Sequence, residues 1–192
     1  MSGTITLGGK TLASHSNDTD KTTLTADEAN VGSNALVVNS SGIITMPNQP
    51  AFLAKAASSY TGNGTTAGYE LFEYTDVELN VGSHYDPTST ECKFTAPISG
   101  NYLFSWWASA STIDQTSRYI RLQLYKNGSV YLNPHNTISN EPTNADYNLV
   151  GGTAVVPLSI NDTVQVWWGS NIATNNITFY SDMNFFSGHL IG

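Results

Sequence analysis

The sequence predicts an all-β protein, a two-sheet sandwich or jelly roll that follows an extended, β-rich N-terminal segment. Charged residues make up only 11% of the chain, while Asn, Ser and Thr together supply about a third of it. Because helices draw mainly on Ala, Leu, Glu, Lys and Arg, this composition excludes an all-helical or coiled-coil protein. The aromatic residues all lie after residue 50, among short β-rich runs that alternate with turn residues. These observations favour a packed β domain at the C-terminal side.

Residues 1–46 form the first predicted segment. They contain no Phe, Tyr or Trp, and Gly and Asn break up their short β-branched runs. Such a segment has too little apolar bulk to close a core by itself. We expect either a flexible tail or a segment that becomes ordered by winding around sister chains or by docking into a larger particle. The apolar side chains that could anchor it are Ile5, Leu7, Leu12, Leu36 and Val38.

Residues 47–50, Pro-Asn-Gln-Pro, are predicted to form a rigid joint, and residues 51–192 the β domain. Its β-rich runs, several of them alternating, are residues 94–96, 102–108, 119–125, 153–158, 163–168 and 177–190. The clearest turn is the Asn127-Gly128 hairpin, because both residues tolerate a positive φ. Several short strands in about 140 residues are typical of a sandwich or jelly roll.

Two of the predicted strands carry aromatic residues on both faces. Along residues 102–108, Trp106 lies on the apolar face and Trp107 on the other; along residues 163–168, Trp168 and Trp167 are divided in the same way. A monomer buries only one face of an outer strand, so the second Trp needs cover. A loop of the same chain, a neighbouring subunit or a stacked sugar ring could provide it. Trp107 and Trp167 are therefore candidates for ligand stacking.

Aromatic and turn motifs follow one another in a fixed order from Phe72 to Ile191. The run Phe94-Thr95-Ala96-Pro97 precedes Gly100-Asn101-Tyr102-Leu103-Phe104-Ser105-Trp106, and the last strand ends in Phe186-Ser187-Gly188-His189-Leu190-Ile191. In this order the motifs resemble the C1q-like globular domain of the TNF/C1q superfamily, whose signature is a Phe before a Pro turn, then G-x-Y-x-F-x-aromatic, and an F-S-G-x-L-I ending. One departure is Asn161, where the family often has Gly.

This resemblance implies a ten-stranded jelly roll that assembles as a tight homotrimer, with both chain ends near its base, and a binding module rather than an enzyme. The candidates for the trimer core or interface are Tyr102, Phe104, Trp106, Trp107, Trp167, Trp168 and Phe186. Some relatives hold calcium near the trimer axis, and the candidate oxygen donors here are Asp146, Asp162 and Asp182. Calcium needs roughly six to eight closely set oxygens. Because these residues are scattered, we expect no cofactor, and calcium is the one metal to test.

Residues 41–52 resemble a junction of bacteriophage fibre and appendage proteins, in which a short β-rich anchor or shaft leads into a trimeric knob. This resemblance implies a virion structural protein: a tail fibre, or a tail or head appendage (head decoration). Other virion proteins would hold residues 1–46, and the knob would bind host-surface glycan or protein, or cap and stabilise the particle. The start of the sequence lacks the pattern of a signal peptide, which fits synthesis in the host cytoplasm. The alternative is a free, lectin-like C1q module that binds carbohydrate or protein.

Charge and missing motifs exclude several other functions. The net charge is −8 and no cluster of Lys and Arg exists, which argues against nucleic-acid binding. No apolar run reaches the roughly 18 residues of a membrane span, so membrane insertion is not expected. The nucleophile elbow, the P-loop and the dinucleotide fingerprint are all missing from the sequence, and Glu70, Glu73 and Glu78 are expected to be solvated charges. No catalytic residue is assigned, and Cys92 is expected to be partly exposed and unreactive.

Overall fold

The computed structural model describes residues 4–7, 10–15, 22–24, 29–31, 36–38, 43–63, 69–111, 118–138, 148–171 and 176–192. The chain divides into two compact units, Met1–Gln49 and Pro50–Gly192. Within the described ranges every regular element is a β-strand, which confirms the all-β prediction. In the same ranges we find no helix with the length and apolar character needed to cross a membrane.

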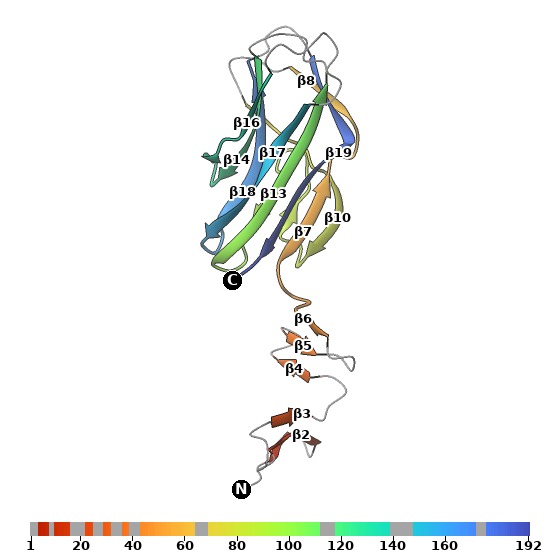
Figure 1. Cartoon of the computed structure of the whole chain (residues 1–192), viewed down its shortest axis with the longest axis vertical. Helices are drawn as coiled ribbons and strands as arrows, with labels where there is room; N and C mark the ends of the chain where they lie inside the picture. Colours follow the sequence, from red (N-terminus) through yellow and green to blue (C-terminus); the bar gives the residue numbers. More distant parts are fainter. Residues whose placement is uncertain are drawn as a thin grey trace. The chain divides into compact units, whose positions relative to one another are not determined.

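The described part of the first unit consists of two small antiparallel sheets (Figure 1). One contains β1 (Thr4–Leu7), β2 (Lys10–His15) and β3 (Thr22–Leu24), and the other contains β4 (Ala29–Val31), β5 (Leu36–Val38) and β6 (Ile44–Thr45). Each strand pairs with its neighbour in sequence. The candidate anchor residues Ile5, Leu7, Leu12, Leu36 and Val38 belong to β1, β2 and β5, and their side chains lie outside what the structure describes.

The second unit is a sandwich of two antiparallel sheets, which we name after the Trp on the outward face of each (Figure 1). The Trp107 sheet has the order β10-β7-β19-β13-β17, with β8 also pairing β19. Its strands are β7 (Ala51–Lys55), β8 (Tyr60–Asn63), β10 (Asp76–Val81), β13 (Gly100–Ser111), β17 (Asn148–Leu158) and β19 (Asn176–Leu190).

The Trp167 sheet has the order β11-β12-β18-β14-β15, with β16 also pairing β14 and β9 also pairing β18. Its strands are β9 (Glu70–Leu71), β11 (Tyr85–Asp86), β12 (Lys93–Thr95), β14 (Arg118–Lys126), β15 (Ser129–Leu132), β16 (His135–Ile138) and β18 (Thr163–Ser170). The chain passes repeatedly from one sheet to the other, as in a jelly roll. The six predicted β-rich runs fall on β12, β13, β14, β17, β18 and β19.

Aromatic rings fill the space between the two sheets. Phe52 stacks on Tyr85 with ring centres 4.6 Å apart, and Trp106 donates a hydrogen bond across the sandwich to the backbone oxygen of Leu122 at 2.8 Å. Five of the residues proposed for the trimer core or interface lie instead in the core of a single protomer: Tyr102, Phe104, Trp106, Trp168 and Phe186. Side chains alternate between the two faces of a sheet, and the side chains of these five residues lie on the face that packs against the other sheet. Only Trp107 and Trp167 of that set face outward.

Two features of the backbone position the ends of the second unit and its clearest hairpin. Asn127 and Gly128 have φ values of 52° and 74° between β14 and β15, which confirms the predicted turn. The backbone N–H of Leu190 donates to Pro50 at 3.0 Å, and the N–H of Asn101 donates to Gly192 at 2.5 Å. Residue 50 and the C-terminus therefore lie at the same end of the sandwich (Figure 1), as the family resemblance implies.

Candidate functional site

The outward face of the Trp107 sheet is predominantly apolar. Leu53 on β7, Trp107 on β13 and Phe185 on β19 are half-buried, while Leu149 and Val155 on β17 are about half exposed. These residues occupy the strand positions that alternate with the core residues, so they lie opposite the packed side of the sheet. The hydroxyl side chains of Ser187, Ser105 and Thr153 form one row across this face. Large apolar side chains gathered on an outward face are typical of surfaces that other molecules cover.

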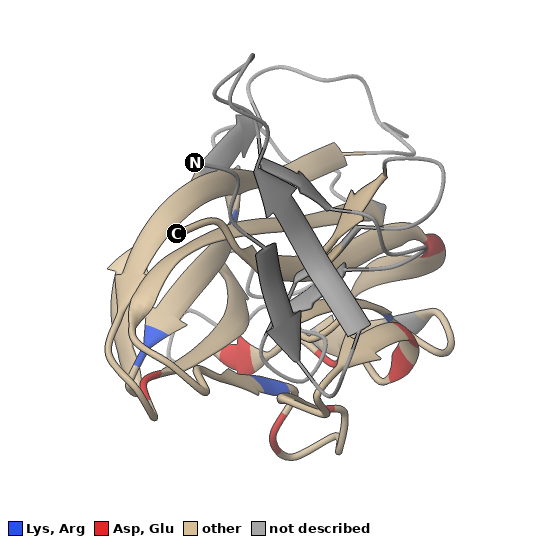
Figure 2. Ribbon diagram, turned by 90° about the horizontal axis from the view of Figure 1, so that it is seen from below, with Lys and Arg blue, Asp and Glu red and all other residues tan. Residues whose placement is uncertain are grey.

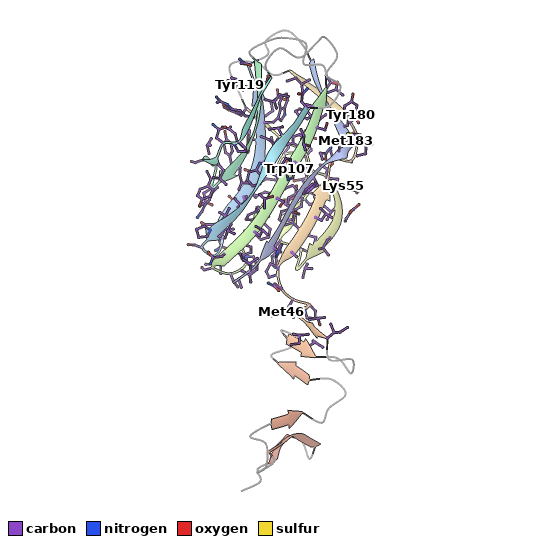
Figure 3. The ribbon with its side chains drawn as sticks, viewed as in Figure 1. Met46, Lys55, Trp107, Tyr119, Tyr180 and Met183 are labelled. Carbon is purple, nitrogen blue, oxygen red and sulfur yellow. The ribbon has the colours of Figure 1, made fainter. Side chains whose placement is uncertain are left out.

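An open hollow of about 730 Å³ lies on this face. Leu53, Lys55, Trp107, Ser109, Leu149, Asp182, Met183, Asn184 and Phe185 line it, and Figure 3 shows Trp107, Met183 and Lys55 along the strands that carry them. Gly151 pairs with Trp107 across β13 and β17, and a Cβ at Gly151 would lie 2.9 Å from the Trp107 ring. The absence of a side chain at Gly151 therefore gives the indole room beside β17.

The hollow offers little for acid–base chemistry. Its two charged lining residues, Lys55 and Asp182, are both at exposed or half-exposed positions. Lys55 forms an ion pair with Glu78, and the hydrogen bond that its ammonium group donates to this carboxylate raises the pKa of the lysine. Asn184 is buried and accepts a hydrogen bond from the backbone N–H of Ala56 at 2.7 Å. The lining of the hollow is therefore suited to contact with an apolar surface.

The outward face of the Trp167 sheet has a different character, because its rings are mixed with amide and guanidinium groups. Trp167 and Tyr125 lie with ring centres 5.2 Å apart. The guanidinium carbon of Arg121 lies 4.3 Å from the centre of the Tyr119 ring, and its Nη1 donates to the Tyr69 hydroxyl at 2.9 Å. We call Tyr69, Tyr119, Arg121, Gln123, Tyr125 and Trp167 the Trp167 cluster.

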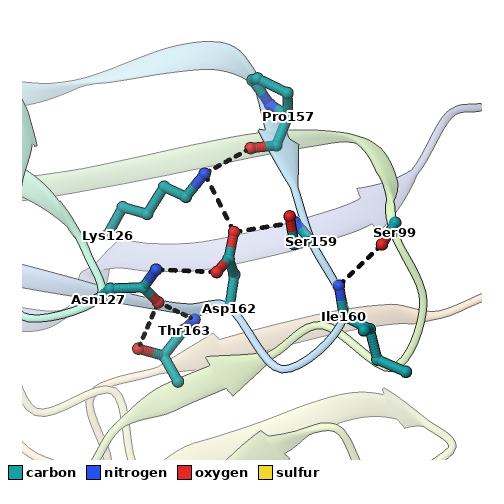
Figure 4. A network of polar contacts seen from close by, with 8 residues as sticks. All are labelled: Ser99, Lys126, Asn127, Pro157, Ser159, Ile160, Asp162 and Thr163. Carbon is teal, nitrogen blue, oxygen red and sulfur yellow. Dashed lines mark hydrogen bonds and ion pairs between the residues drawn. The ribbon is translucent and has the colours of Figure 1, made fainter.

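The carboxylate of Asp162, one of the candidate calcium donors, forms hydrogen bonds and an ion pair with neighbouring protein groups (Figure 4). Its carboxylate accepts hydrogen bonds from Asn127 Nδ2 and the Ser159 N–H, both at 2.8 Å, and lies 3.1 Å from Lys126 Nζ. The hydrogen bond from Asn127, followed by those from Ser159 and Lys126, lowers the pKa of Asp162 to about 2. This carboxylate therefore fastens the β17–β18 turn to the β14–β15 hairpin.

Asp182, the second candidate donor, does not join Asp162 in a metal site. Asp182 lines the hollow on the Trp107 sheet, and Asp146 lies outside the described residues. Across the ranges that the structure describes, no group of three or more His, Cys, Asp or Glu side chains is placed to hold a metal ion. The charges that can be seen are separated patches on a mostly uncharged ribbon (Figure 2).

Of two expectations about reactive side chains, the one for the glutamates is confirmed and the one for the exposure of Cys92 is wrong. Glu70 on β9 and Glu78 on β10 are exposed, as expected, and belong to different sheets. Cys92, expected to be partly exposed, is fully buried, and its Sγ donates to the Thr88 carbonyl at 3.3 Å. Burial is the main cause that raises its pKa to about 11, so the thiol is held in its unreactive form.

Sequence reasoning did not identify Arg121, Gln123 and Tyr125 as members of a surface cluster. A signal for them exists, because Tyr119, Arg121, Gln123 and Tyr125 alternate with apolar residues in the run 119–125 and must share a face. Tyr69 belongs to the same cluster but lies 52 residues away from Arg121. Only the fold brings it there.

The two outward faces of the jelly roll therefore differ, because one carries mainly apolar side chains around its hollow and the other mixes aromatic rings with amide and guanidinium groups. The model of the C1q domain family matches residues 51–191. The chain belongs to the C1q domain family.

Several solved structures are similar to this chain in fold. The globular domain of zebrafish complement 1qA is 19% identical over 75% of this chain and 98% of that one, with a TM-score of 0.51. Eiger TNF from S. frugiperda is 13% identical over 76% of this chain and 94% of that one, with a TM-score of 0.53. Murine APRIL at pH 5.0 is 10% identical over 74% and 99%, with a TM-score of 0.52. At sequence identities this low, the comparison with these structures shows a shared fold and nothing about function.

Proposed function

We propose that this chain forms a homotrimer through the outward face of its Trp107 sheet, and that the trimer is a virion structural protein of the fibre or appendage type. The observation that carries the assembly is the apolar lining of the hollow, where Trp107 and Phe185 pair directly across β13 and β19 and Leu53 lines the same hollow from β7. Stable protein interfaces bury roughly 800 Å² on each partner and have an apolar centre. The lining of the hollow comes from four strands of the sheet, β7, β13, β17 and β19, so this face is wide enough to form an interface of that kind.

The polar groups on the same face also suit a permanent contact. Ser105 Oγ and Thr153 Oγ1 lie 2.8 Å apart on β13 and β17 and satisfy one another. Burying neutral hydroxyl groups between subunits costs less desolvation free energy than burying charged groups. The low charge of the chain therefore supports assembly at this face.

The virion role rests on the first unit and on the junction that follows it. Residues 41–52 resemble the anchor-to-knob junction of bacteriophage fibre proteins, and Ile43, Ile44 and Met46 in this stretch are more than half exposed. Under the proposal, other virion proteins cover these apolar side chains and hold residues 1–46. Residues 51–192 form the knob, which binds host-surface glycan or protein, or caps and stabilises the particle in the virion.

Two measurements test the proposal. Native mass spectrometry should give a mass of three chains, and a stable folded monomer would refute the assembly. A variant without residues 1–46 should remain a soluble trimer, because the jelly roll has its own core, but should no longer be incorporated into particles. Incorporation of the shortened protein at the level of the full chain would refute the anchoring role.

The second candidate function is a free C1q-like module that binds carbohydrate or protein, and the Trp167 cluster is the observation that favours it. Its rings and hydrogen-bonding groups are typical of a recognition surface. Purified particles distinguish the two candidates, since an attached protein sediments with particles and a free module stays in the supernatant.

A further inference from the structure

Three buried polar atoms on the outward face of the Trp167 sheet have no hydrogen-bond partner among the residues that the structure describes: Arg121 Nε, Gln123 Oε1 and Trp167 Nε1. Gln123 and Trp167 pair directly across β14 and β18, and Arg121 lies two residues before Gln123 on the same face. A buried polar atom without a partner destabilises the fold. Three such atoms on neighbouring positions of one face therefore indicate a ligand that supplies the missing partners. Trp168 Nε1, the fourth unpaired atom among the described residues, lies in the core instead.

The side chains that carry these atoms are held in place by their other groups. Gln123 is only 2% exposed, and its Nε2 donates to Asn133 Oδ1 at 2.9 Å. Arg121 is fixed by the Tyr69 hydroxyl and the Tyr119 ring. Exchanging the oxygen and nitrogen of the Gln123 amide still leaves one amide atom unpaired, because Asn133 is the one partner that the structure gives it. The cluster is therefore preorganised and only partly satisfied.

Aromatic rings surround the unpaired atoms. Trp167 and Tyr125 are half-buried and contact each other, so part of each ring reaches the surface. Tyr69 lies over Gly169, where a Cβ would be 2.5 Å from the Tyr69 ring. Tyr69 and Asn133 are both at exposed positions. Under the inference below, a ligand that reaches the buried atoms displaces these two side chains and replaces their hydrogen bonds to Arg121 and Gln123.

We infer that the Trp167 cluster binds a neutral carbohydrate. A pyranose ring offers C–H groups that pack on aromatic faces and hydroxyl groups that both donate and accept hydrogen bonds. Its hydroxyl oxygens accept from Trp167 Nε1 and Arg121 Nε, and one of its hydroxyl groups donates to Gln123 Oε1. Arg121 is the one charge in the cluster, and its guanidinium group already contacts the Tyr119 ring and the Tyr69 hydroxyl. The net charge of −8 disfavours the approach of an anionic polymer. This inference names the ligand class for the binding role proposed above and rests on it.

The test is a titration of the full-length protein with four neutral hexasaccharides: maltohexaose, cellohexaose, chitohexaose and mannohexaose. Calorimetry or saturation-transfer NMR should show that one or more of them binds with a Kd of about 1 mM or tighter. Trp167→Ala should weaken this binding at least tenfold, about 1.4 kcal/mol. Tyr131→Ala removes an exposed aromatic from β15 outside the cluster and should leave the binding unchanged.

Gln123→Met separates a binding role from a structural one. Met has a similar volume but lacks the unpaired oxygen, so affinity should fall several-fold while Tm stays the same or rises. A lower Tm with unchanged affinity would show that Gln123 is structural and would overturn the inference. Wild-type protein that binds none of the four probes at about 10 mM would also overturn it. Native mass spectrometry of the same samples keeps the two proposals apart, since a trimer that binds no saccharide refutes only this one.

Discussion

At the scale of residues, Asn127 and Asp162 join two turns that are 35 residues apart in the sequence. Asn127 adopts the positive φ of the hairpin, donates to the Asp162 carboxylate and accepts from the Thr163 N–H at 2.8 Å. A glycine at this position would give the backbone the same freedom but none of these hydrogen bonds. The turn residue therefore also makes the largest contribution to lowering the pKa of Asp162.

Replacing Asp162 by Asn should lower Tm in a pH-dependent way. The pKa of Asp162 is about 2 in the folded protein, below its ordinary value of 3.8. Its stabilising contribution is therefore complete above pH 3.8 and is lost as the pH falls toward 2. Thermal unfolding followed by circular dichroism should show a Tm difference between Asp162→Asn and wild type at neutral pH that shrinks across this range. A difference that stays constant with pH would contradict the assignment.

Cys92 should resist thiol reagents in the folded protein. The side chain is fully buried and its pKa is raised to about 11, so almost no thiolate is present at neutral pH. An Ellman assay should give no reaction under native conditions and one thiol per chain in denaturant. Rapid labelling of the native protein would show that this segment opens readily.

At the scale of elements, β19 organises the Trp107 sheet. Its 15 residues pair with β7, β8 and β13, and Gly188 allows two rings to pack over it. A Cβ at Gly188 would lie 2.5 Å from Phe104 and 2.7 Å from Phe52. The Phe-Ser-Gly ending therefore needs a glycine at this position, because the packed core has no space for a side chain there.

Gly188→Ala should destabilise the domain by about 1–3 kcal/mol, because the added methyl group overfills a packed core. Urea unfolding should show the loss in the free energy of unfolding. Ser187→Ala is the matched control, since Ser187 is the neighbouring residue and points away from the core. Equal stability of the two variants would mean that the rings repack without strain.

At the scale of the whole molecule, the two sheets present different outward faces. The Trp107 face is apolar and suits a sister subunit, while the Trp167 face has unpaired polar atoms and suits a ligand. Such a division allows assembly and recognition to occur on opposite sides of one small domain. Substitutions on the two faces should then affect different measurements.

Val155→Asp should disrupt the trimer, because it places a charge on the apolar face at a position that is already 51% exposed in the protomer. Val130→Asp is the matched control, since Val130 is 48% exposed on β15 of the other sheet. Sedimentation should show monomers for Val155→Asp and trimers for Val130→Asp, with native far-UV spectra for both. Trimers for both variants would show that the subunit interface lies on another face of the domain.

The sequence predicts the strands well where alternation is long, as in the runs 102–108 and 163–168, and it correctly separates Trp106 from Trp107 and Trp168 from Trp167. Strands of two residues, such as β9 and β11, have no periodicity to detect. The burial of Cys92 and the contact between Tyr69 and Arg121 depend on distant segments that only the fold brings together. For the same reason, the sequence could not show that Phe186 lies in the core of one protomer rather than between subunits.

The position of β7 determines how the domain would respond to tension. β7 begins directly after Pro50 and lies between β10 and β19, with ladders to both. Hydrogen bonds between antiparallel strands run perpendicular to the strand axis, so a pull along β7 from residue 50 loads both ladders in shear. The bonds must then break together rather than one after another. A domain held through this strand resists mechanical extraction at the place where the chain enters it.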